Sequence, residues 1–321
     1  MTDKMKFYLK IVILFLIMGG LYFATNVEAS SNVYSAEFTP DYKSYMFVPY
    51  ENMSDMTFSN SYFSFQWWVK FKSLPTDGNK MVFFSKWDYD IMQEGSYIGW
   101  IENNAGVYAI EFCVENDSQL EYNYCVQRNI TTPEIGVWHN FEFLYWLTNH
   151  YAFLYQNGQM LGTAANLTIT TLYDSYTPFT IGAETYDPFN GDGINYLDGY
   201  IDDFRIWVGS SPRQHWESVG TQLYGDETDL FAYWNMDGNG NDIVGNHNLY
   251  NNGLINFVPD IPFTSLDNIF YQENQGTKLS EINPFYFWIT FFVFIGPWII
   301  LIMFVFWLLK ILTSINPRSR L

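Results

Sequence analysis

Residues 63–72 decide the fold class, because they read Phe-Ser-Phe-Gln-Trp-Trp-Val-Lys-Phe-Lys. Apolar side chains occupy every second position from Phe63 to Phe71, and Ser, Gln and Lys occupy most positions between them. Alternation with a period of two is typical of a β-strand that has one face in the core and the other toward water. Only Trp68 interrupts the polar face. The segment therefore predicts a strand.

Other short segments of this kind follow along the chain, separated by Gly- and Asn-rich turns. They are 81–87, 97–101, 107–115, 121–127, 138–146, 151–155, 179–183, 199–208 and 230–236. Asn157-Gly158 predicts a hairpin with a type I′ turn, because this pair accepts positive φ at both positions. The one helical candidate, 211–220, is short. The pattern predicts an all-β fold, a two-sheet antiparallel jelly-roll sandwich.

The composition excludes one class of partner. The chain has 321 residues, 21% of them aromatic, and its formal net charge is −19. Nucleic-acid binding needs clustered Lys and Arg, so no nucleic-acid partner is expected. The acidity fits a solvated surface outside the cytoplasm or Ca²⁺ sites, and solubility alone is the simpler of these two interpretations.

The first 29 residues have the pattern of a signal peptide. Lys4, Lys6 and Lys10 precede the apolar run 11–23, and small residues precede Ser30. This is the order of regions in a cleavable signal peptide, so we expect 1–29 to be removed. The alternative is a signal anchor that is not cleaved.

A second apolar run predicts a transmembrane helix over 284–309. Residues 285–309 carry no charge and number about 25, enough to cross a bilayer with some tilt. Lys310, Arg318 and Arg320 follow the run, so the positive-inside rule places the tail 310–321 in the cytosol. Residues 260–283 are expected to form a stalk. The sequence therefore predicts a type I single-pass protein of the plasma membrane or an endomembrane, with its ectodomain outside the cytoplasm.

Two cysteines and four glycosylation sequons agree with this placement. Cys113 and Cys125 lie in two predicted strands around a polar turn, so antiparallel pairing would set them opposite each other for a disulfide. Two free thiols are the alternative. The Asn-x-Ser/Thr sequons at Asn52, Asn116, Asn129 and Asn166 permit glycosylation without arguing for it, since an Asn-rich chain contains such sequons by chance.

Seven fragments resemble, in family order, the laminin-G-like/concanavalin-A-like jelly roll of the pentraxin-related branch. Phe63–Lys70 is similar to the family strand F-T-I-E-x-W-V-K, and Gly199–Trp207 is similar to G-x-I-D-D-V-R-I-W. The others are Phe84–Asp88 (L-S-K-W-D in the family), Gly136–Asn140 (G-x-W-H-H), Leu154–Gly158 (L-Y-V-N-G), Thr180–Ala183 (I-G-A) and Ala232–Asn246 (the closing strand and its turn). The resemblance covers residues 33–255 and implies one sandwich ectodomain over 30–259.

The residues do not predict an enzyme. Glucanases of this shape use carboxylates spaced as E-x-D-x-x-E on one strand. Asp202-Asp203 and the pair Glu115 and Asp117 lack that spacing, and the four His are scattered. No catalytic residue is therefore assigned.

Asp202 is the most informative acidic residue. It has the same parity as Tyr200, Phe204 and Ile206, which predicts that it shares their core face, whereas Asp203 would pair with an outward Arg205. A carboxylate on a core face is unfavourable unless it is paired or bound to a metal.

The resemblance to Ca²⁺-binding family members allows a calcium site around that carboxylate. Asp202 would be one ligand, joined by Asp237 and Asp41. The alternative for Asp202 is a structural carboxylate that accepts backbone N–H groups.

The leading functional prediction is a recognition or adhesion module that binds a glycan or protein ligand. The aromatic candidates for glycan contact are Trp87, Tyr89, Trp100, Tyr186 and Phe189. The alternatives are a structural subunit of a membrane assembly that binds no sugar and, less favoured, a glycoside hydrolase.

Overall fold

The computed structural model describes residues 33–58, 62–88, 94–116, 123–169, 171–175, 177–187, 192–209 and 223–262. All of them belong to the first of two compact units, 1–265. The predicted signal peptide, helix 211–220, transmembrane helix and cytoplasmic tail, and the stalk beyond residue 262, lie outside the described residues. Within the described ranges, no helix is both long and apolar enough to cross a membrane.

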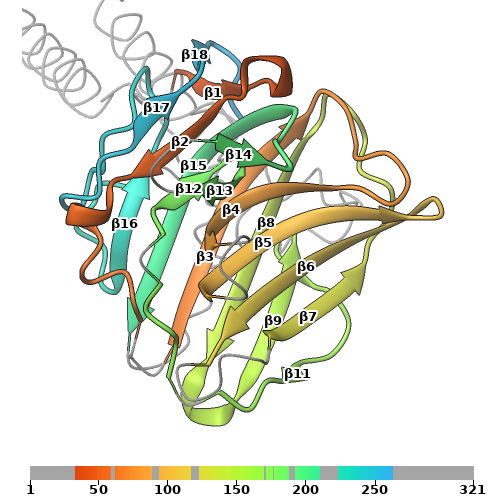
Figure 1. Ribbon diagram of the computed structural model, residues 1–321, viewed down its shortest axis with the longest axis vertical. Coiled ribbons are helices and arrows are strands. Elements are labelled where there is room, and N and C mark those ends of the chain that lie inside the picture. The colour runs from red at the N-terminus through yellow and green to blue at the C-terminus, as the bar shows by residue number, and fades with distance from the viewer. Residues whose placement is uncertain are drawn as a thin grey trace, which may run out of the picture. The chain divides into compact units, whose positions relative to one another are not determined.

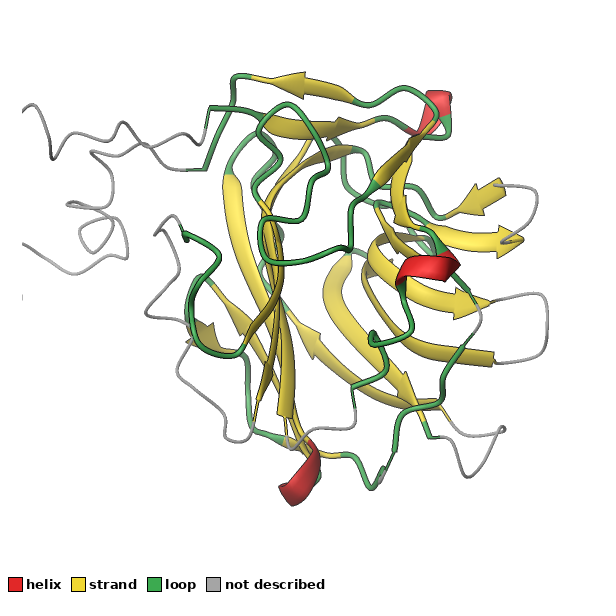
Figure 2. Cartoon of the chain, turned by 90° about the vertical axis from the view of Figure 1, so that its left-hand side faces the viewer, coloured by secondary structure: helices red, strands yellow, loops and turns green. Residues whose placement is uncertain are grey.

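The described residues form two stacked antiparallel sheets, as predicted (Figures 1 and 2). Sheet A has the order β10-β9-β8-β3-β15-β1-β18, with β11 also paired to β9 and β16 to β15. Its strands are β1 (Ser35–Phe38), β3 (Tyr62–Phe71), β8 (Trp138–Trp146), β9 (Tyr151–Gln156), β10 (Gln159–Met160), β11 (Ala165–Asn166), β15 (Gly199–Gly209), β16 (Leu230–Trp234) and β18 (Asn256–Val258).

Sheet B has the order β17-β2-β12-β4-β5-β6-β7. Its strands are β2 (Tyr45–Val48), β4 (Lys80–Asp88), β5 (Glu94–Asn104), β6 (Val107–Glu115), β7 (Asn123–Asn129), β12 (Phe179–Ile181) and β17 (Tyr250–Asn252). A separate hairpin joins β13 (Glu184–Asp187) to β14 (Asp192–Ile194), and the 3-10 helices are η1 (Pro40–Tyr42), η2 (Tyr50–Asn52) and η3 (Leu147–Asn149).

Strand β3 supplies the centre of the core. The five apolar residues predicted to share one face, from Phe63 to Phe71, all belong to the main core cluster between the sheets. Phe65 stacks on Phe84 of the opposite sheet with ring centroids 4.4 Å apart. Each large apolar side chain buried in this way contributes about 1.5–3 kcal/mol to folding. Trp68, on the other face, is also buried, which agrees with a structural role.

Local turn chemistry sets the hairpin register. Asn157 and Gly158 have φ of 49° and 76°, so the predicted type I′ turn between β9 and β10 is confirmed. Strand β15 differs from the prediction. Asp202 pairs with Trp68 of β3 and Arg205 pairs with Gln66, so two residues of β15 lie opposite the single residue between these partners and form a bulge.

This bulge reverses the alternation of side chains along β15. Asp203 lies within it with φ of 55°. Ile201 before the bulge and Phe204 after it both belong to the core cluster. Because consecutive strand residues point to opposite faces, Asp202 points to the outer side of sheet A. The prediction that Asp202 shares the core face is therefore wrong, and the inserted residue is the physical reason.

Candidate functional site

The three predicted calcium ligands do not form one site. Both Asp237 oxygens are occupied by the protein: Oδ1 accepts N–H groups of Val33 and Tyr34 at 2.6 and 3.0 Å, and Oδ2 accepts the Asn235 amide at 2.9 Å. Asp41 is exposed in η1, and Asp202 is buried beside β3.

The group of potential metal ligands found among the described residues does not contain Asp41, Asp202 or Asp237. Among the described residues, the group of three potential ligands whose donor atoms lie within 4.8 Å of one another is Glu111, Cys113 and Cys125. The residues Asp41, Asp202 and Asp237 therefore do not fit a shared calcium site, and no step below depends on calcium.

A structural ion pair occupies the outer side of β15. Arg205 pairs with Asp203, as predicted, and its Nη1 donates to Gln66 Oε1 at 3.2 Å. The guanidinium also lies 5.6 Å from the centroid of the Tyr233 ring. All four residues are buried. Because they are buried, a ligand cannot reach them, and we infer that this cluster stabilises the fold.

The candidate site is on the outer face of sheet B, over β5, β6 and β7. Alternation directs Trp100 and Glu102 of β5, Glu111 of β6 and Gln127 of β7 away from the core, because Ile101, Ile110 and Phe112 belong to it. The register sets Trp100 opposite Glu111 and Glu111 opposite Gln127. Cross-strand neighbours of this kind are close enough for their side chains to interact.

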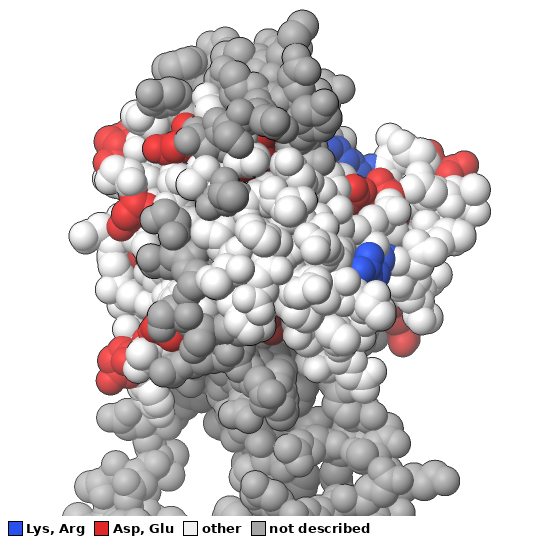
Figure 3. Space-filling view, turned by 90° about the horizontal axis from the view of Figure 1, so that it is seen from below, with Lys and Arg blue, Asp and Glu red and all other residues white. Residues whose placement is uncertain are grey.

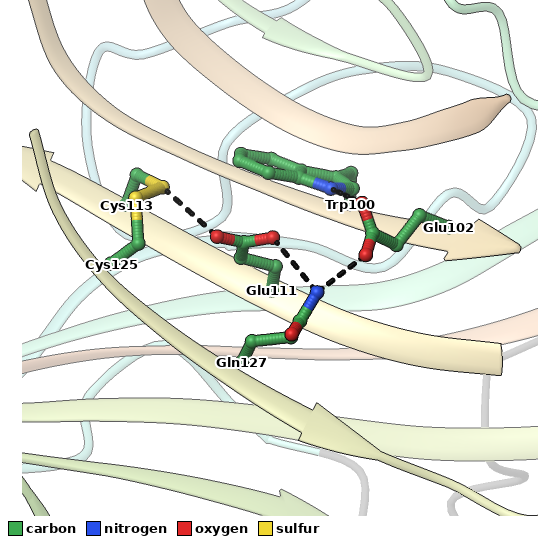
Figure 4. The surroundings of a disulfide bond; sticks show 6 residues. All are labelled: Trp100, Glu102, Glu111, Cys113, Cys125 and Gln127. Atoms are coloured by element: carbon green, nitrogen blue, oxygen red, sulfur yellow. Dashed lines mark hydrogen bonds between the residues drawn. A yellow bond between two sulfur atoms is a disulfide. The ribbon is translucent and has the colours of Figure 1, made fainter. Parts of the chain in front are cut away.

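Hydrogen bonds connect these side chains into one surface (Figure 4). Gln127 Nε2 donates to Glu102 Oε1 and, at 3.4 Å, to Glu111 Oε2. The indole N–H of Trp100 donates to Glu102 Oε2 at 3.4 Å. The Asn104 amide also donates to Glu102. Trp100, Glu102 and Glu111 are partly exposed and Gln127 is exposed, so this network can be reached from solvent.

Trp100 packs on one side against buried apolar residues. The indole packs against a small cluster of Val82, Trp87, Ile98 and Cys113. Trp87 lies flat on Gly95, where a Cβ would come within 2.0 Å of the ring. Only glycine permits this approach, so Gly95 fixes the position of the Trp87 ring beneath the surface.

The charge of the surface is negative. Burial raises the pKa of Glu111 to about 7, and the neighbouring Glu102 carboxylate adds to the shift, opposed by Lys80 and Gln127. Lys80 lies 4.5 Å from the Trp100 ring centroid and pairs with the buried Glu184 at 3.0 Å. The cation nearest to the indole is therefore held by another carboxylate. Elsewhere on the molecule, the view from below in Figure 3 shows acidic side chains at several places around the visible face and basic ones on its right-hand side.

The predicted disulfide is confirmed at the edge of this surface. Cys113 and Cys125 are bonded, are paired in the register of β6 and β7, and have Cα atoms 4.1 Å apart. Cys113 Sγ lies 3.9 Å from Glu111 Oε1. Because a disulfide sulfur carries no proton, this is a contact and not a hydrogen bond.

A family model fits this chain. The model of the concanavalin A-like lectin/glucanases superfamily, Laminin_G_3, matches residues 44–212. The chain belongs to that superfamily. The superfamily's description joins lectins to glucanases, so membership alone does not separate binding from hydrolysis. No curated protein sequence matches the chain.

Comparison with solved structures finds similarities at low sequence identity. A candidate carbohydrate-binding protein of Bacteroides ovatus is 17% identical with a TM-score of 0.52, covering 72% of this chain but only 61% of that one. A heptameric pentraxin of Limulus polyphemus is 15% identical with a TM-score of 0.49, covering 73% of this chain and 98% of that one. Domains LG4-5 of mouse laminin α1 are 14% identical with a TM-score of 0.35, covering 55% and 42%. These similarities concern the fold alone.

Of the aromatic residues predicted to contact glycan, Trp100 lies on the outer face of β5, β6 and β7. Trp87 is buried beneath it. Tyr89 and Phe189 fall outside the described residues, as does the side chain of Tyr186.

The carboxylates that accompany Trp100 were not among the residues predicted from the sequence. Glu102 and Glu111 are nine residues apart, on different strands. The feature of the sequence that could have located these two carboxylates is the turn at Ala105-Gly106, where both residues have positive φ (53° and 84°). Centring the hairpin on this turn pairs Trp100 with Glu111 and would have brought both acids to the aromatic candidate.

The pKa of Glu111 predicts how stability varies with pH. Between pH 4.5, the ordinary pKa, and about 7, the folded protein keeps a proton that the unfolded chain has released. The free energy of unfolding therefore falls as the pH rises through this window. Glu111→Gln removes this loss, and we expect it to stabilise the protein at pH 8 by about 1–2 kcal/mol more than at pH 4.5, allowing for partial exposure. Chemical unfolding at both pH values measures this difference. Asn129→Gln, a change without charge on β7, is the control, and an equal response of both variants contradicts the assignment.

Proposed function

We propose that this lectin-like domain is a recognition module that binds a glycan on the outer face of β5, β6 and β7. The main support for this proposal is the arrangement of side chains around Trp100. A partly exposed indole, Trp100, stands among side chains that donate and accept hydrogen bonds, namely Glu102, Asn104, Glu111 and Gln127. Sites for small ligands combine apolar or aromatic contact area with a few placed polar groups that fix orientation. A sugar presents an apolar C–H face and a ring of hydroxyls, which matches both parts.

The charge of this surface selects the ligand class. Two carboxylates accept hydrogen bonds from sugar hydroxyls, and the Asn104 and Gln127 amides supply both donors and acceptors. A sulfate or a sialic acid carboxylate placed here would face the Glu102 carboxylate and, above its pKa of about 7, the Glu111 carboxylate, and would suffer like-charge repulsion. The proposed ligand is therefore a neutral hexose or an amino sugar.

The site is proposed to bind without hydrolysing. The two carboxylates share one amide donor, Gln127, which fixes both in the resting surface. Glycoside hydrolysis needs one carboxyl free to protonate the leaving oxygen and the other to act on the opposite face of the sugar. Release of reducing ends from a bound oligosaccharide, lost in Glu111→Gln, would overturn this part of the proposal in favour of a hydrolase.

The domain is further proposed to be displayed outside the cytoplasm. The signal peptide 1–29, the stalk 260–283 and the helix 284–309 would deliver and hold it as a type I single-pass protein of the plasma membrane or an endomembrane. The disulfide supports this placement, because such bonds persist in oxidising compartments.

The glycan proposal is tested with the full-length protein on a glycan array. Wild type is expected to bind neutral or amino sugars and to leave sulfated and sialylated glycans unbound. Trp100→Ala should lower affinity for the best ligand at least about tenfold, which corresponds to about 1.4 kcal/mol. Tyr224→Ala is the control, because Tyr224 is 78% exposed and is not part of this surface. An array without signal would favour the structural-subunit alternative.

The placement is tested by the sequons. Asn129 and Asn166 are exposed and Asn52 is partly exposed, whereas Asn116 is 5% exposed and has little room for a glycan. When the chain is made in a eukaryotic secretory pathway, Asn129→Gln and Asn166→Gln should each remove one glycan from a gel mobility assay. Asn116→Gln should change nothing. A chain that acquires no glycan at any sequon would contradict lumenal placement.

A further inference from the structure

Glu111, Cys113 and Cys125 bring three potential metal-ligand atoms together. One carboxylate oxygen and the two sulfurs all lie within 4.8 Å of one another. They come from neighbouring strands whose pairing runs from Ala109–Asn129 to Glu115–Asn123 on both sides of the cysteines. The ladder, not the disulfide alone, therefore keeps the two sulfurs opposite each other.

The chemistry of this set depends on the redox state. In the disulfide neither sulfur carries a charge, and the trio offers a single carboxylate. Two thiolates and a carboxylate, by contrast, form a ligand set that suits zinc and other thiophilic divalent cations. We propose that reduction of the Cys113–Cys125 disulfide converts this edge of sheet B into a binding site for one zinc-class divalent cation.

The conversion has two steps, reduction of the disulfide and binding of the cation. A dithiol of the solvent supplies two electrons and two protons and becomes a disulfide, so that the S–S bond of the protein breaks and two thiols form. With a phosphine, phosphorus supplies the two electrons, and water supplies the two protons and leaves its oxygen in the phosphine oxide. The cation then displaces both thiol protons and binds Cys113 Sγ, Cys125 Sγ and one Glu111 oxygen. Cys113 is buried, whereas Cys125 is exposed, so the fourth position of a tetrahedral site opens to water.

Surrounding charges favour a cation at this point. Glu102 lies next to Glu111 through the shared Gln127 amide and adds a second carboxylate outside the ligand set. Lys80 is the nearby positive group, and it is engaged by Glu184. The bound cation would therefore neutralise a surface that reduction makes more negative. Metal and disulfide exclude each other, so the site would report the redox state of the compartment.

Co²⁺ tests this proposal in the full-length protein, because cobalt–thiolate coordination absorbs visible and near-ultraviolet light. After reduction with a phosphine under inert gas, one equivalent of Co²⁺ should give the tetrahedral thiolate spectrum, and Zn²⁺ should displace it. Oxidised protein should give no such spectrum. A spectrum in the oxidised protein, or none in reduced protein that keeps its β-sheet circular dichroism, would overturn the proposal.

Three variants assign the ligands. Cys125→Ser should abolish the thiolate spectrum, and Glu111→Gln should weaken Co²⁺ binding roughly tenfold or more. Glu102→Gln is the matched control, which removes a neighbouring carboxylate but no proposed ligand and should keep the spectrum and stoichiometry. Equal Co²⁺ affinity of Glu111→Gln and wild type would contradict the proposed carboxylate ligand. Because glycan binding is measured on oxidised protein, this result is independent of the proposed function.

Discussion

Replacing Arg205 with alanine is expected to lower the free energy of unfolding by about 3–5 kcal/mol. The side chain is 1% exposed, and its partners among the described residues include the Asp203 carboxylate, the Gln66 amide oxygen and the Tyr233 ring. In Arg205→Ala, the carboxyl group of Asp203 would remain buried without its counter-charge, whether it is ionised or protonated. Burial already raises the pKa of Asp203, and Arg205 is the main group that lowers it.

Matched variants separate the cost of an orphaned charge from the loss of a side chain. Asp203→Asn together with Arg205→Met removes both charges, and Asn tolerates the positive φ at the bulge. This double variant should recover most of the loss. Lys72→Ala breaks a more exposed pair with Glu37 and should cost less than about 1 kcal/mol. Chemical unfolding followed by tryptophan fluorescence measures all three, and an Arg205→Ala loss no larger than that of Lys72→Ala would contradict this account.

Removing the disulfide is expected to be the second large effect. Cys113 and Cys125 are 12 residues apart, and closing a loop of this length restricts the unfolded chain enough to stabilise the folded state by about 3 kcal/mol. Cys113→Ala together with Cys125→Ala should show this loss in chemical unfolding. Alanine is preferred to serine here, because Cys113 packs against Val82, Trp87 and Ile98 and a hydroxyl would be buried among them.

Reduction of the wild type provides the control for that variant. In metal-free buffer, phosphine-treated wild type and the double alanine variant should unfold at nearly the same denaturant concentration. If reduction leaves the midpoint of the wild type unchanged, the cross-link contributes little, and β6 and β7 are held by the ladder and core packing alone.

Much of the fold follows from the sequence, because local rules and the sandwich agree in most strands. The alternation in 63–72 predicted the core face of β3, and Asn157-Gly158 predicted the hairpin turn after β9. The predicted segments 107–115 and 138–146 coincide with β6 and β8. The cysteine pair was predicted because the two strands around it share one register.

The failure at Asp202 has a specific cause. Alternation assumes one residue per position, and the β15 bulge inserts an extra one between Asp202 and Arg205. No Gly or Pro marks that bulge, since Asp203 itself adopts the positive φ. The prediction that Asp202 shares the core face of Phe204 and Ile206 failed for this reason.

The candidate site was predicted only in part. Trp100 was among the aromatic candidates, because the resemblance implied that aromatic side chains on surface loops contact carbohydrate. Glu102, Glu111 and Gln127 were not, because they meet only when β5, β6 and β7 are placed in register. We propose that glycan recognition occurs on this outer face.

Hydroxyl-radical footprinting of the full-length oxidised protein, with and without its best array ligand, tests that claim most directly. We expect the ligand to protect Trp100 strongly and to leave Tyr42 and Tyr224, which are 56% and 78% exposed, as reactive as before. Unchanged reactivity of Trp100, together with protection of Tyr42 beside Asp41 in η1, would contradict it and place recognition at the loop of the predicted calcium ligand instead.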